Sequence, residues 1–167
     1  EHALDIVRDI VATLPAGEPI WPREPATEPA VDPETMEVRE IVLPREATRS
    51  RRLDLTSDGR VWYADWAEGY LGVYDPRTDE IREWETPGTA GKRPYALNTD
   101  TRDRVWLVET GESPNRLIAF DPQAERFTTE VAIPSGAGTI RHMNLNRQTG
   151  ELWFGTDAGT IGRAVLP

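Results

Sequence analysis

The sequence predicts an all-β protein made of about three similar antiparallel units, because two different markers recur along the chain at nearly the same interval. The dipeptide Asp-Pro recurs in steps of 43 and 46 residues, at positions 32–33, 75–76 and 121–122. A pair formed by an aliphatic residue and tryptophan recurs in steps of 44 and 47 residues, at positions 61–62, 105–106 and 152–153. Two independent markers that drift together indicate a true repeat.

Each repeat contains four short β-rich segments with turn residues between them. Asp-Pro is followed by an alternating segment such as 81–85, which a proline ends, and then by a segment such as 95–97. A polar turn leads to an aromatic segment such as 61–64, and 71–74 runs into the next Asp-Pro. These are hairpin signals. Four strands in a repeat of roughly 40–50 residues are typical of a β-propeller blade, so we expect about three four-stranded antiparallel blades.

The recurring tryptophans favour a structural role over a ligand-binding role, because large flat side chains fill the space between packed sheets. We expect Trp62, Trp106 and Trp153 to occupy equivalent buried positions in successive blades.

The strand pattern divides the chain into residues 1–34, a helical leader with a Pro-rich linker, and residues 35–167, the three blades. The first strand, 36–43, has no preceding partner, and the last unit ends after its third strand, 161–164. Each end could complement the other. We therefore expect a partial propeller, a piece of a longer one, or half of a homodimer that completes the propeller by strand exchange.

The leader has a different pattern from the repeats. Its apolar residues fall on one helical face: Ala3, Ile6, Val7, Ile10, Val11 and Leu14. Pro15 ends this predicted helix, and six prolines in residues 15–33 indicate an extended linker.

Composition excludes several classes of function. The net charge is −10, of which −6 falls in residues 1–34, and excess negative charge argues against a nucleic-acid partner. The absence of cysteine excludes disulfides and thiolate chemistry. No apolar run approaches the roughly 20 residues that a membrane span requires, so no membrane partner is expected. The compartment stays open between cytoplasm and periplasm or secretion.

Two repeated motifs resemble the virginiamycin B lyase (streptogramin lyase) family. One runs from the aromatic segments 62–66, 106–109 and 153–156 to a downstream Leu-Gly-Val or Ile-Gly-Arg at 71–73 and 161–163. The other lies eleven residues before each tryptophan, where the family tends to place Pro-His and this chain has Arg51, Tyr95 and His142. The resemblance covers roughly residues 31–167 and implies the C-terminal part of a propeller.

The resemblance also implies a chemistry. Such enzymes are carbon–oxygen lyases that open an ester-linked ring by elimination, with a histidine as base and Mg²⁺ among acidic side chains. Imidazole suits abstraction of an acidic C–H proton near pH 7, and Mg²⁺ prefers oxygen ligands and polarises a carbonyl. Carried over by position, His142 is the expected catalytic base and Glu109 and Asp65 the expected metal ligands. Thr156 stands where the blade of His142 would offer glutamate.

Each of these residues also has a simpler interpretation. His142 could face the central channel without chemistry, and Glu109 and Asp65 could be solvated strand ends.

Arg51, Tyr95 and Arg141 are the expected substrate-binding residues. Arg51, Arg52 and Arg93 crowd one end of the blades, either as a salt-bridged rim or as a site for an anionic ligand. A lyase, a propeller that binds a small molecule or a partner protein, and a structural fragment all remain open.

Overall fold

The computed structural model describes residues 27–89 and 91–167. The chain divides into two compact units, Glu1–Val42 and Leu43–Pro167. In the first unit, β1 (Thr27–Val31) pairs antiparallel with β2 (Val38–Val42). The Asp-Pro turn between them is held by Asp32, whose Oδ1 accepts hydrogen bonds from the backbone N–H groups of Glu34 (2.8 Å) and Thr35 (3.0 Å). This is the side-chain turn that favours aspartate.

The described part of the second unit contains two four-stranded antiparallel sheets and one three-stranded sheet. The first sheet, in spatial order, consists of β3 (Ser50–Leu55), β4 (Val61–Asp65), β5 (Tyr70–Asp75) and β6 (Glu80–Glu85). The second consists of β7 (Pro94–Thr99), β8 (Val105–Glu109), β9 (Arg116–Asp121) and β10 (Arg126–Ala132). The third consists of β11 (Met143–Asn146), β12 (Glu151–Gly155) and β13 (Ile161–Val165).

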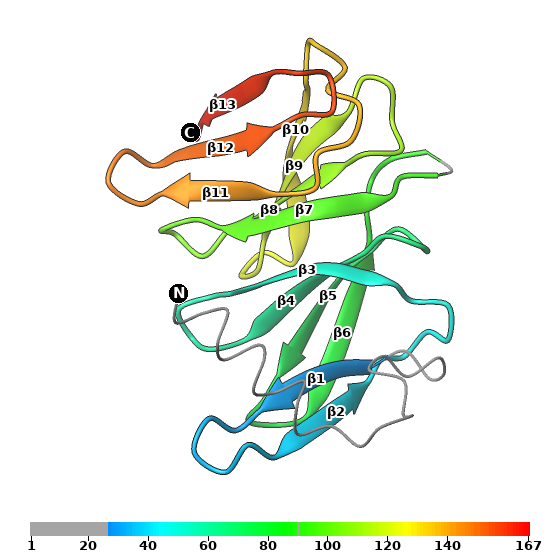
Figure 1. The fold of residues 1–167 in the computed structure, drawn as a ribbon, viewed down its shortest axis with the longest axis vertical. Coiled ribbons are helices and arrows are strands. Elements are labelled where there is room, and N and C mark those ends of the chain that lie inside the picture. The colour runs from blue at the N-terminus through cyan, green and yellow to red at the C-terminus, as the bar shows by residue number, and fades with distance from the viewer. Residues whose placement is uncertain (1–26, 90) are drawn as a thin grey trace. The chain divides into compact units, whose positions relative to one another are not determined.

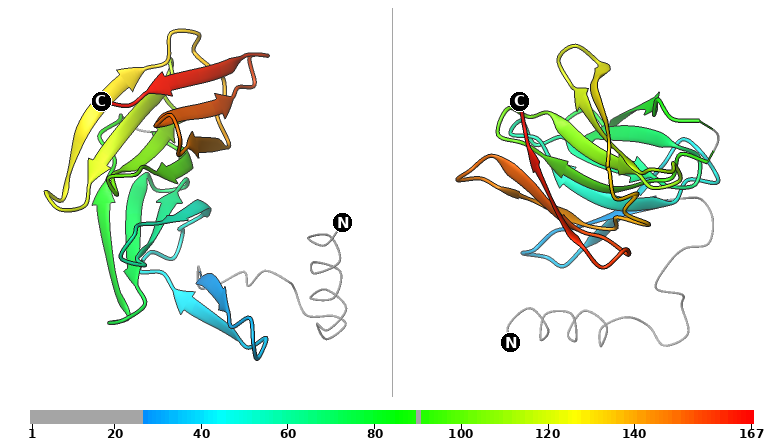
Figure 2. Two further views of the ribbon diagram at one scale, coloured as in Figure 1. Left: turned by 90° about the vertical axis from the view of Figure 1, so that its left-hand side faces the viewer. Right: turned by 90° about the horizontal axis from the view of Figure 1, so that it is seen from above.

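The three sheets follow one another as consecutive blades. The innermost strands β3, β7 and β11 lie side by side (Figure 1), and β7 contacts both of the others. Figure 2 (left) shows the outer strands β6 and β10 on the opposite side from these inner strands. The expected all-β repeat of antiparallel blades is therefore confirmed, with a third blade of three strands.

Two apolar clusters join neighbouring blades. Trp62 and Leu71 of the first blade pack with Leu107 and Phe120 of the second. Trp106 and the opposite face of the second blade pack with Phe154 and other residues of the third. Each internal junction thus pairs the tryptophan face of one blade with the aliphatic face of the next.

The recurring tryptophans occupy equivalent positions, each on the second strand of its blade. Trp62 pairs in register with Val73, Trp106 with Ala119 and Trp153 with Arg163. Trp62 and Trp106 are 0% and 2% exposed, but Trp153 is 40% exposed. The expectation that all three are buried is wrong for Trp153, because no described blade follows the third one to cover it.

The glycine of the recurring Leu-Gly-Val and Ile-Gly-Arg motifs makes room for an aromatic ring. A Cβ added to Gly72 would lie 2.0 Å from Tyr63 Cζ, and one added to Gly162 would lie 2.1 Å from Phe154 Cε2. In the second blade the corresponding cross-strand pair is Leu107 and Ile118. Leu107 on β8 is smaller than the aromatic residues at the equivalent positions, so β9 can carry Ile118 in place of glycine. The recurring glycine motif is therefore explained by side-chain packing.

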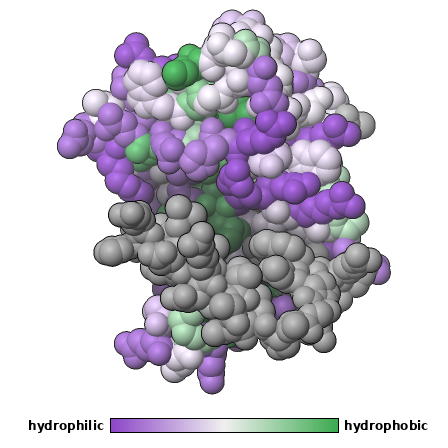
Figure 3. Space-filling view, viewed as in Figure 1, coloured by the Kyte–Doolittle hydropathy of each residue, from purple (hydrophilic) through white to green (hydrophobic). Residues whose placement is uncertain are grey.

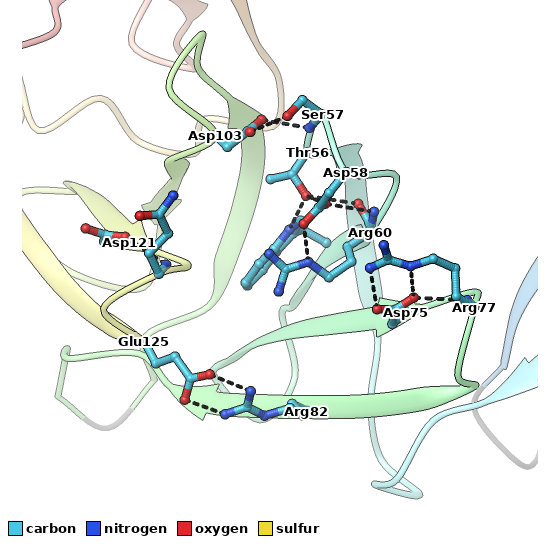
Figure 4. A network of polar contacts seen from close by, with 12 residues as sticks. Thr56, Ser57, Asp58, Arg60, Asp75, Arg77, Arg82, Asp103, Asp121 and Glu125 are labelled. Carbon is cyan, nitrogen blue, oxygen red and sulfur yellow. Dashed lines mark hydrogen bonds and ion pairs between the residues drawn. The ribbon is translucent and has the colours of Figure 1, made fainter.

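Polar contacts also join the first two blades (Figure 4). Asp103 accepts hydrogen bonds from the N–H (2.7 Å) and the hydroxyl (2.5 Å) of Ser57. Arg82 of β6 donates two hydrogen bonds of 2.5 Å to Glu125, in the turn before β10. These bonds fix the relative position of the inner and outer parts of the two blades.

The structure differs from the sequence prediction near the N-terminus. Residues 27–31, assigned above to an extended linker, form β1, and the expected unpartnered strand 36–43 is β2, paired with β1. The alternation of polar and apolar residues in the sequence around Pro29 is too short to predict a strand. The predicted helix before Pro15 lies outside the described residues. Among the described residues, no helix is long and apolar enough to span a membrane.

Candidate functional site

The residues singled out by the repeat all lie at one end of the blades. Arg51 and Tyr95 begin the inner strands β3 and β7, and His142 directly precedes β11. Asp65 and Glu109 end the neighbouring strands β4 and β8, which run antiparallel to the inner strands, so that Ser50 pairs with Asp65 and Pro94 with Glu109. Antiparallel pairing therefore brings the five side chains to the same end.

Asp65 is fully buried and acts as a turn cap. Its Oδ1 accepts hydrogen bonds from three backbone N–H groups, those of Arg49 (3.0 Å), Ala67 (3.0 Å) and Glu68 (3.3 Å). Its Oδ2 is also buried and has no hydrogen-bond partner in the described protein. One oxygen thus organises the loop from β4 to β5.

Glu109 is fully buried and neutralised by a neighbouring arginine. Its Oε1 accepts a hydrogen bond from the Gly88 N–H (2.9 Å), and its Oε2 accepts two from Arg116, one of them from Nε at 3.0 Å. Arg116 also pairs with Glu130 at 2.8 Å. Burial lowers the pKa of Arg116, but the hydrogen bonds and charges of Glu109 and Glu130 outweigh it, so that its pKa lies above the ordinary value. The Arg116 guanidinium therefore stays positively charged beside Glu109.

The residues expected to hold Mg²⁺ do not fit that role. Both oxygens of Glu109 are engaged by Gly88 and Arg116, and Asp65 offers one enclosed oxygen. Within the described ranges, no group of three or more His, Asp and Glu side chains is arranged to hold a metal ion. A hard cation needs several oxygen ligands, and an arginine in the same place repels it.

Beside these carboxylates lies a cluster of cations and rings, the arginine–aromatic cluster, made of Arg51, Arg52, Trp66, Arg93 and Tyr95. The guanidinium carbons of Arg51 and Arg93 each lie 5.1 Å from the Trp66 ring centroid. Arg51 and Arg52 lie 5.7 Å and 5.5 Å from the Tyr95 ring centroid. All four distances are within cation–π range.

The positive charges of this cluster are not balanced by neighbouring carboxylates. Among the described residues, none of Arg51, Arg52 and Arg93 forms an ion pair. The Arg52 Nη1 donates to the Arg51 carbonyl oxygen (3.0 Å), and its Nε is buried and has no hydrogen-bond partner in the part of the chain that the structure describes. Arg51 and Arg93 are exposed, while both rings are half-buried. The salt-bridged rim considered above is therefore absent here, in a chain whose net charge is −10.

His142 and Arg141 belong to a separate groove on the third blade. His142 is exposed, and its Nε2 lies 3.1 Å from the Asn144 Nδ2. Arg141 forms an ion pair with Asp157 at 2.6 Å. Together with Trp153, Thr156 and Ile161, among others, these side chains line a groove of about 490 Å³. Among the described residues, no hydrogen bond, ion pair or cation–π contact joins His142 or Arg141 to Tyr95 or Arg51.

Sequence reasoning brought Arg51 and Tyr95 together but missed Trp66 as a site residue. Trp66 follows Asp65, and the turn that Asp65 caps directs it toward the inner strands. The signal was a second tryptophan four residues after Trp62, absent from the other repeats.

Comparisons with known proteins identify the fold. No protein-family model matches the chain, and no curated protein matches it. Solved structures do match. A catalytically inactive virginiamycin B lyase from Staphylococcus aureus, solved with quinupristin, superposes with a TM-score of 0.68 and 20% identity over 84% of this chain and 49% of that one.

Two further matches support the same assignment. A streptogramin B lyase structure matches with a TM-score of 0.68 and 16% identity, over 84% of this chain and 48% of that one. The extracellular domain of a protein assigned as a hybrid two-component system from B. thetaiotaomicron matches with a TM-score of 0.63 and 13% identity, over 81% of this chain and 17% of that one.

These likenesses establish architecture. The chain spans about half the length of the lyase structures that it matches, and identity of this order shows the fold alone. The described blades are structurally similar to part of the virginiamycin B lyase β-propeller.

Proposed function

We propose that this protein is a ligand-binding propeller module whose arginine–aromatic cluster binds a small organic anion carrying a carboxylate or phosphate group. The single observation that carries the proposal is the group of three arginines, which lie within cation–π distance of Trp66 or Tyr95 and form no ion pair with a described carboxylate. Unbalanced like charges held together are costly unless an anion offsets them.

The geometry suits such a ligand for two further reasons. Arginine presents several N–H donors in a planar fork, which matches carboxylate and phosphate oxygens. The half-buried rings of Trp66 and Tyr95 hold the guanidinium groups in place, so that less side-chain freedom is lost when a ligand binds. The same rings offer an apolar surface to a flat ligand.

Isothermal titration of the purified chain with phenyl phosphate, benzoate and benzylamine tests the proposal. We expect the two anions to bind and the amine, which has the same ring and the opposite charge, to show no binding. Raising the salt concentration should weaken the binding of both anions, because salt screens exposed charges. No binding of either anion at millimolar concentration would contradict the proposal.

Variants locate the binding to the cluster. Arg51→Ala and Arg93→Ala should each lower the affinity for phenyl phosphate by about tenfold, which is the effect of losing one charge-assisted hydrogen bond. Arg147→Ala is the matched control, because Arg147 is exposed and lies in the turn between β11 and β12. An equal loss in all three variants would indicate nonspecific attraction to positive charge.

A carbon–oxygen lyase is the alternative function, because His142 is exposed in a groove of about 490 Å³. In that case His142 is the base, and no metal-dependent step is assigned, since Glu109 and Asp65 do not fit Mg²⁺. Incubation of the chain with quinupristin, with and without Mg²⁺, tests this alternative. Ring opening by elimination gives a product of unchanged mass, which chromatography separates from the substrate. Activity that disappears in His142→Ala would establish the lyase over the binding module.

A further inference from the structure

A β-bulge interrupts the inner strand of each of the first two blades at the arginine–aromatic cluster. The register between β3 and β4 shifts within residues 50–53, and the register between β7 and β8 shifts within residues 94–97. Arg51 and Arg52 lie in the first bulge, and Tyr95 lies in the second. Bulges are common beside binding sites, because the extra residue redirects a side chain.

The bulge in β3 allows two consecutive arginines to reach the same ring. In a regular strand, consecutive side chains point to opposite faces of the sheet. The guanidinium carbons of Arg51 and Arg52 nevertheless lie 5.7 Å and 5.5 Å from the centroid of the Tyr95 ring. The Arg52 Nη1 also donates to the Arg51 carbonyl oxygen (3.0 Å), which fixes the direction of its side chain. Two positive charges are therefore held beside Tyr95.

Arg51 belongs to a second pair of cations as well. Its guanidinium carbon lies 5.1 Å from the centroid of the Trp66 ring, and that of Arg93 lies 5.1 Å from the same centroid. The two carbons are therefore separated by no more than twice that distance. Figure 3, seen from the same side as Figure 1, shows strongly hydrophilic side chains around the start of β7, on the right. Arg51 thus lies within cation–π range of both rings.

A ligand with a single acidic group would not balance the charge of these two pairs. Within residues 27–89 and 91–167, no carboxylate forms an ion pair with Arg51, Arg52 or Arg93. One acidic group would offset one of these positive charges and leave the others close together. Two acidic groups on one molecule would offset the charge beside each ring.

We propose that the arginine–aromatic cluster contains two adjacent anion subsites that share Arg51, and that its ligand is a small flat molecule with two acidic groups. One group binds between Arg51 and Arg93, beside Trp66. The other binds between Arg51 and Arg52, beside Tyr95. This inference rests on the proposed function and narrows its ligand class. Two linked groups bind more tightly than one, because binding of the first holds the second near its subsite.

Isothermal titration of the wild-type chain with isophthalate and benzoate provides the test. The two ligands share one ring and differ by one carboxylate. We expect isophthalate to bind about tenfold more tightly than benzoate, with one molecule per chain. A gain no larger than the statistical factor of about two would overturn the paired subsites, while benzoate binding would still support the anion site. No binding of either ligand would contradict the anion site itself.

Variants show whether the preference for isophthalate arises in the cluster. Arg52→Ala and Arg93→Ala each leave one subsite complete, so we expect the ratio of the two affinities to fall to the statistical factor in both. Arg147→Ala removes the same charge from an exposed turn and should keep the wild-type ratio. Circular dichroism confirms that the variants fold, and the wild-type comparison does not depend on them. A similar fall in Arg147→Ala would overturn the proposal, because general attraction to positive charge would then explain the preference.

Discussion

Single residues at the end of the blades show that equivalent sequence positions can have different roles. Glu109 stands at the position that the resemblance assigned to a metal ligand, yet its oxygens hold Gly88 and Arg116. Arg116 lies seven residues further along the chain, at the start of β9, opposite Glu109 in register. The cross-strand partner decides whether the carboxylate is available, and a motif based on one strand does not include it.

The first prediction concerns this pair. Glu109→Gln keeps the shape and one hydrogen-bond acceptor but removes the charge that faces Arg116, so we expect a loss of about 2 kcal/mol in the free energy of unfolding. Urea denaturation measures it, with Glu130→Gln, at the more exposed end of the same arginine, as the milder control. Added Mg²⁺ should leave the unfolding midpoint unchanged in wild type and variant. A midpoint that rises with Mg²⁺ only in the wild type would restore Glu109 as a ligand.

The second prediction concerns Asp100, which caps a turn and holds the buried Trp106. Its Oδ2 accepts hydrogen bonds from Trp106 Nε1 (2.9 Å) and Arg104 Nε (2.7 Å). Burial raises the pKa of Asp100, but these bonds and two from the backbone N–H groups of Arg102 and Arg104 outweigh it, so that its pKa lies below the ordinary value of 3.8.

A lowered folded-state pKa means that the charged form stabilises the fold above the unfolded pKa, and that this contribution is lost as the pH falls through the folded pKa. We therefore expect Asp100→Asn to lower stability by about 1–2 kcal/mol at pH 7. The difference from wild type should shrink as the pH is taken below 3.8. Urea unfolding across that range measures it, and a difference independent of pH would contradict the assignment.

Single residues also show where sequence reasoning ends. Eleven-residue spacing placed Arg51 and Tyr95 correctly together, because equivalent repeats put equivalent residues at neighbouring strand starts. The spacing says nothing of loop side chains, so Trp66 was missed, and it cannot show that Arg141 is paired with Asp157. Whether an arginine is free depends on loops from other parts of a blade.

At the scale of strands and hairpins, the aromatic–glycine pairs explain the recurring motif. Phe154 on β12 lies over Gly162 on β13, and both face the second blade. The second blade solves the same packing problem with Leu107 and Ile118. The two members of each cross-strand pair therefore fill one space together, so that a larger residue on one strand requires a smaller one on the other.

The third prediction follows from this sharing. Gly162→Ile alone places side-chain atoms within the Phe154 ring and should cost about 1–3 kcal/mol through overpacking. Phe154→Leu alone leaves a cavity and should cost about 1–3 kcal/mol. The double variant recreates the pair of the second blade, so we expect it to be clearly more stable than the sum of the single losses. Strict additivity in denaturation experiments would show that the two side chains do not share one space.

The elements themselves were predictable where the repeat is strong. Alternation, polar turns and recurring tryptophans identified the strands of the three blades, including the third strand that ends the described chain, 161–165. β1 was missed, because Thr27–Val31 contains a proline and lies in a Pro-rich segment. Its pairing with β2 depends on the hairpin at Asp32, whose turn signal was assigned to the repeat alone.

At the scale of the whole molecule, blade order determines which faces are buried. Trp62 and Trp106 are covered by the following blade, and Trp153 meets none in the described chain. Equivalent sequence positions therefore have different environments at the ends of a repeat array. The repeat predicted the position of Trp153 but not its exposure.

The inner-strand end is also where the blades combine their functional side chains. The arginine–aromatic cluster draws Arg51 and Arg52 from β3, Trp66 from the loop after β4, and Arg93 and Tyr95 from the second blade. Its positive charge thus depends on two blades standing side by side, which the bonds between Ser57 and Asp103 and between Arg82 and Glu125 maintain (Figure 4).

The central claim, that this cluster binds a small organic anion, is tested most directly by the indole N–H signals of the six tryptophans in a ¹⁵N-labelled sample. A Trp66→Phe variant assigns the Trp66 signal by its absence. On titration with phenyl phosphate, we expect this signal to shift progressively and to saturate, while the buried Trp62 and Trp106 signals stay in place. A titration in which the Trp66 signal does not move, or in which all six signals shift together without saturation, would contradict the claim.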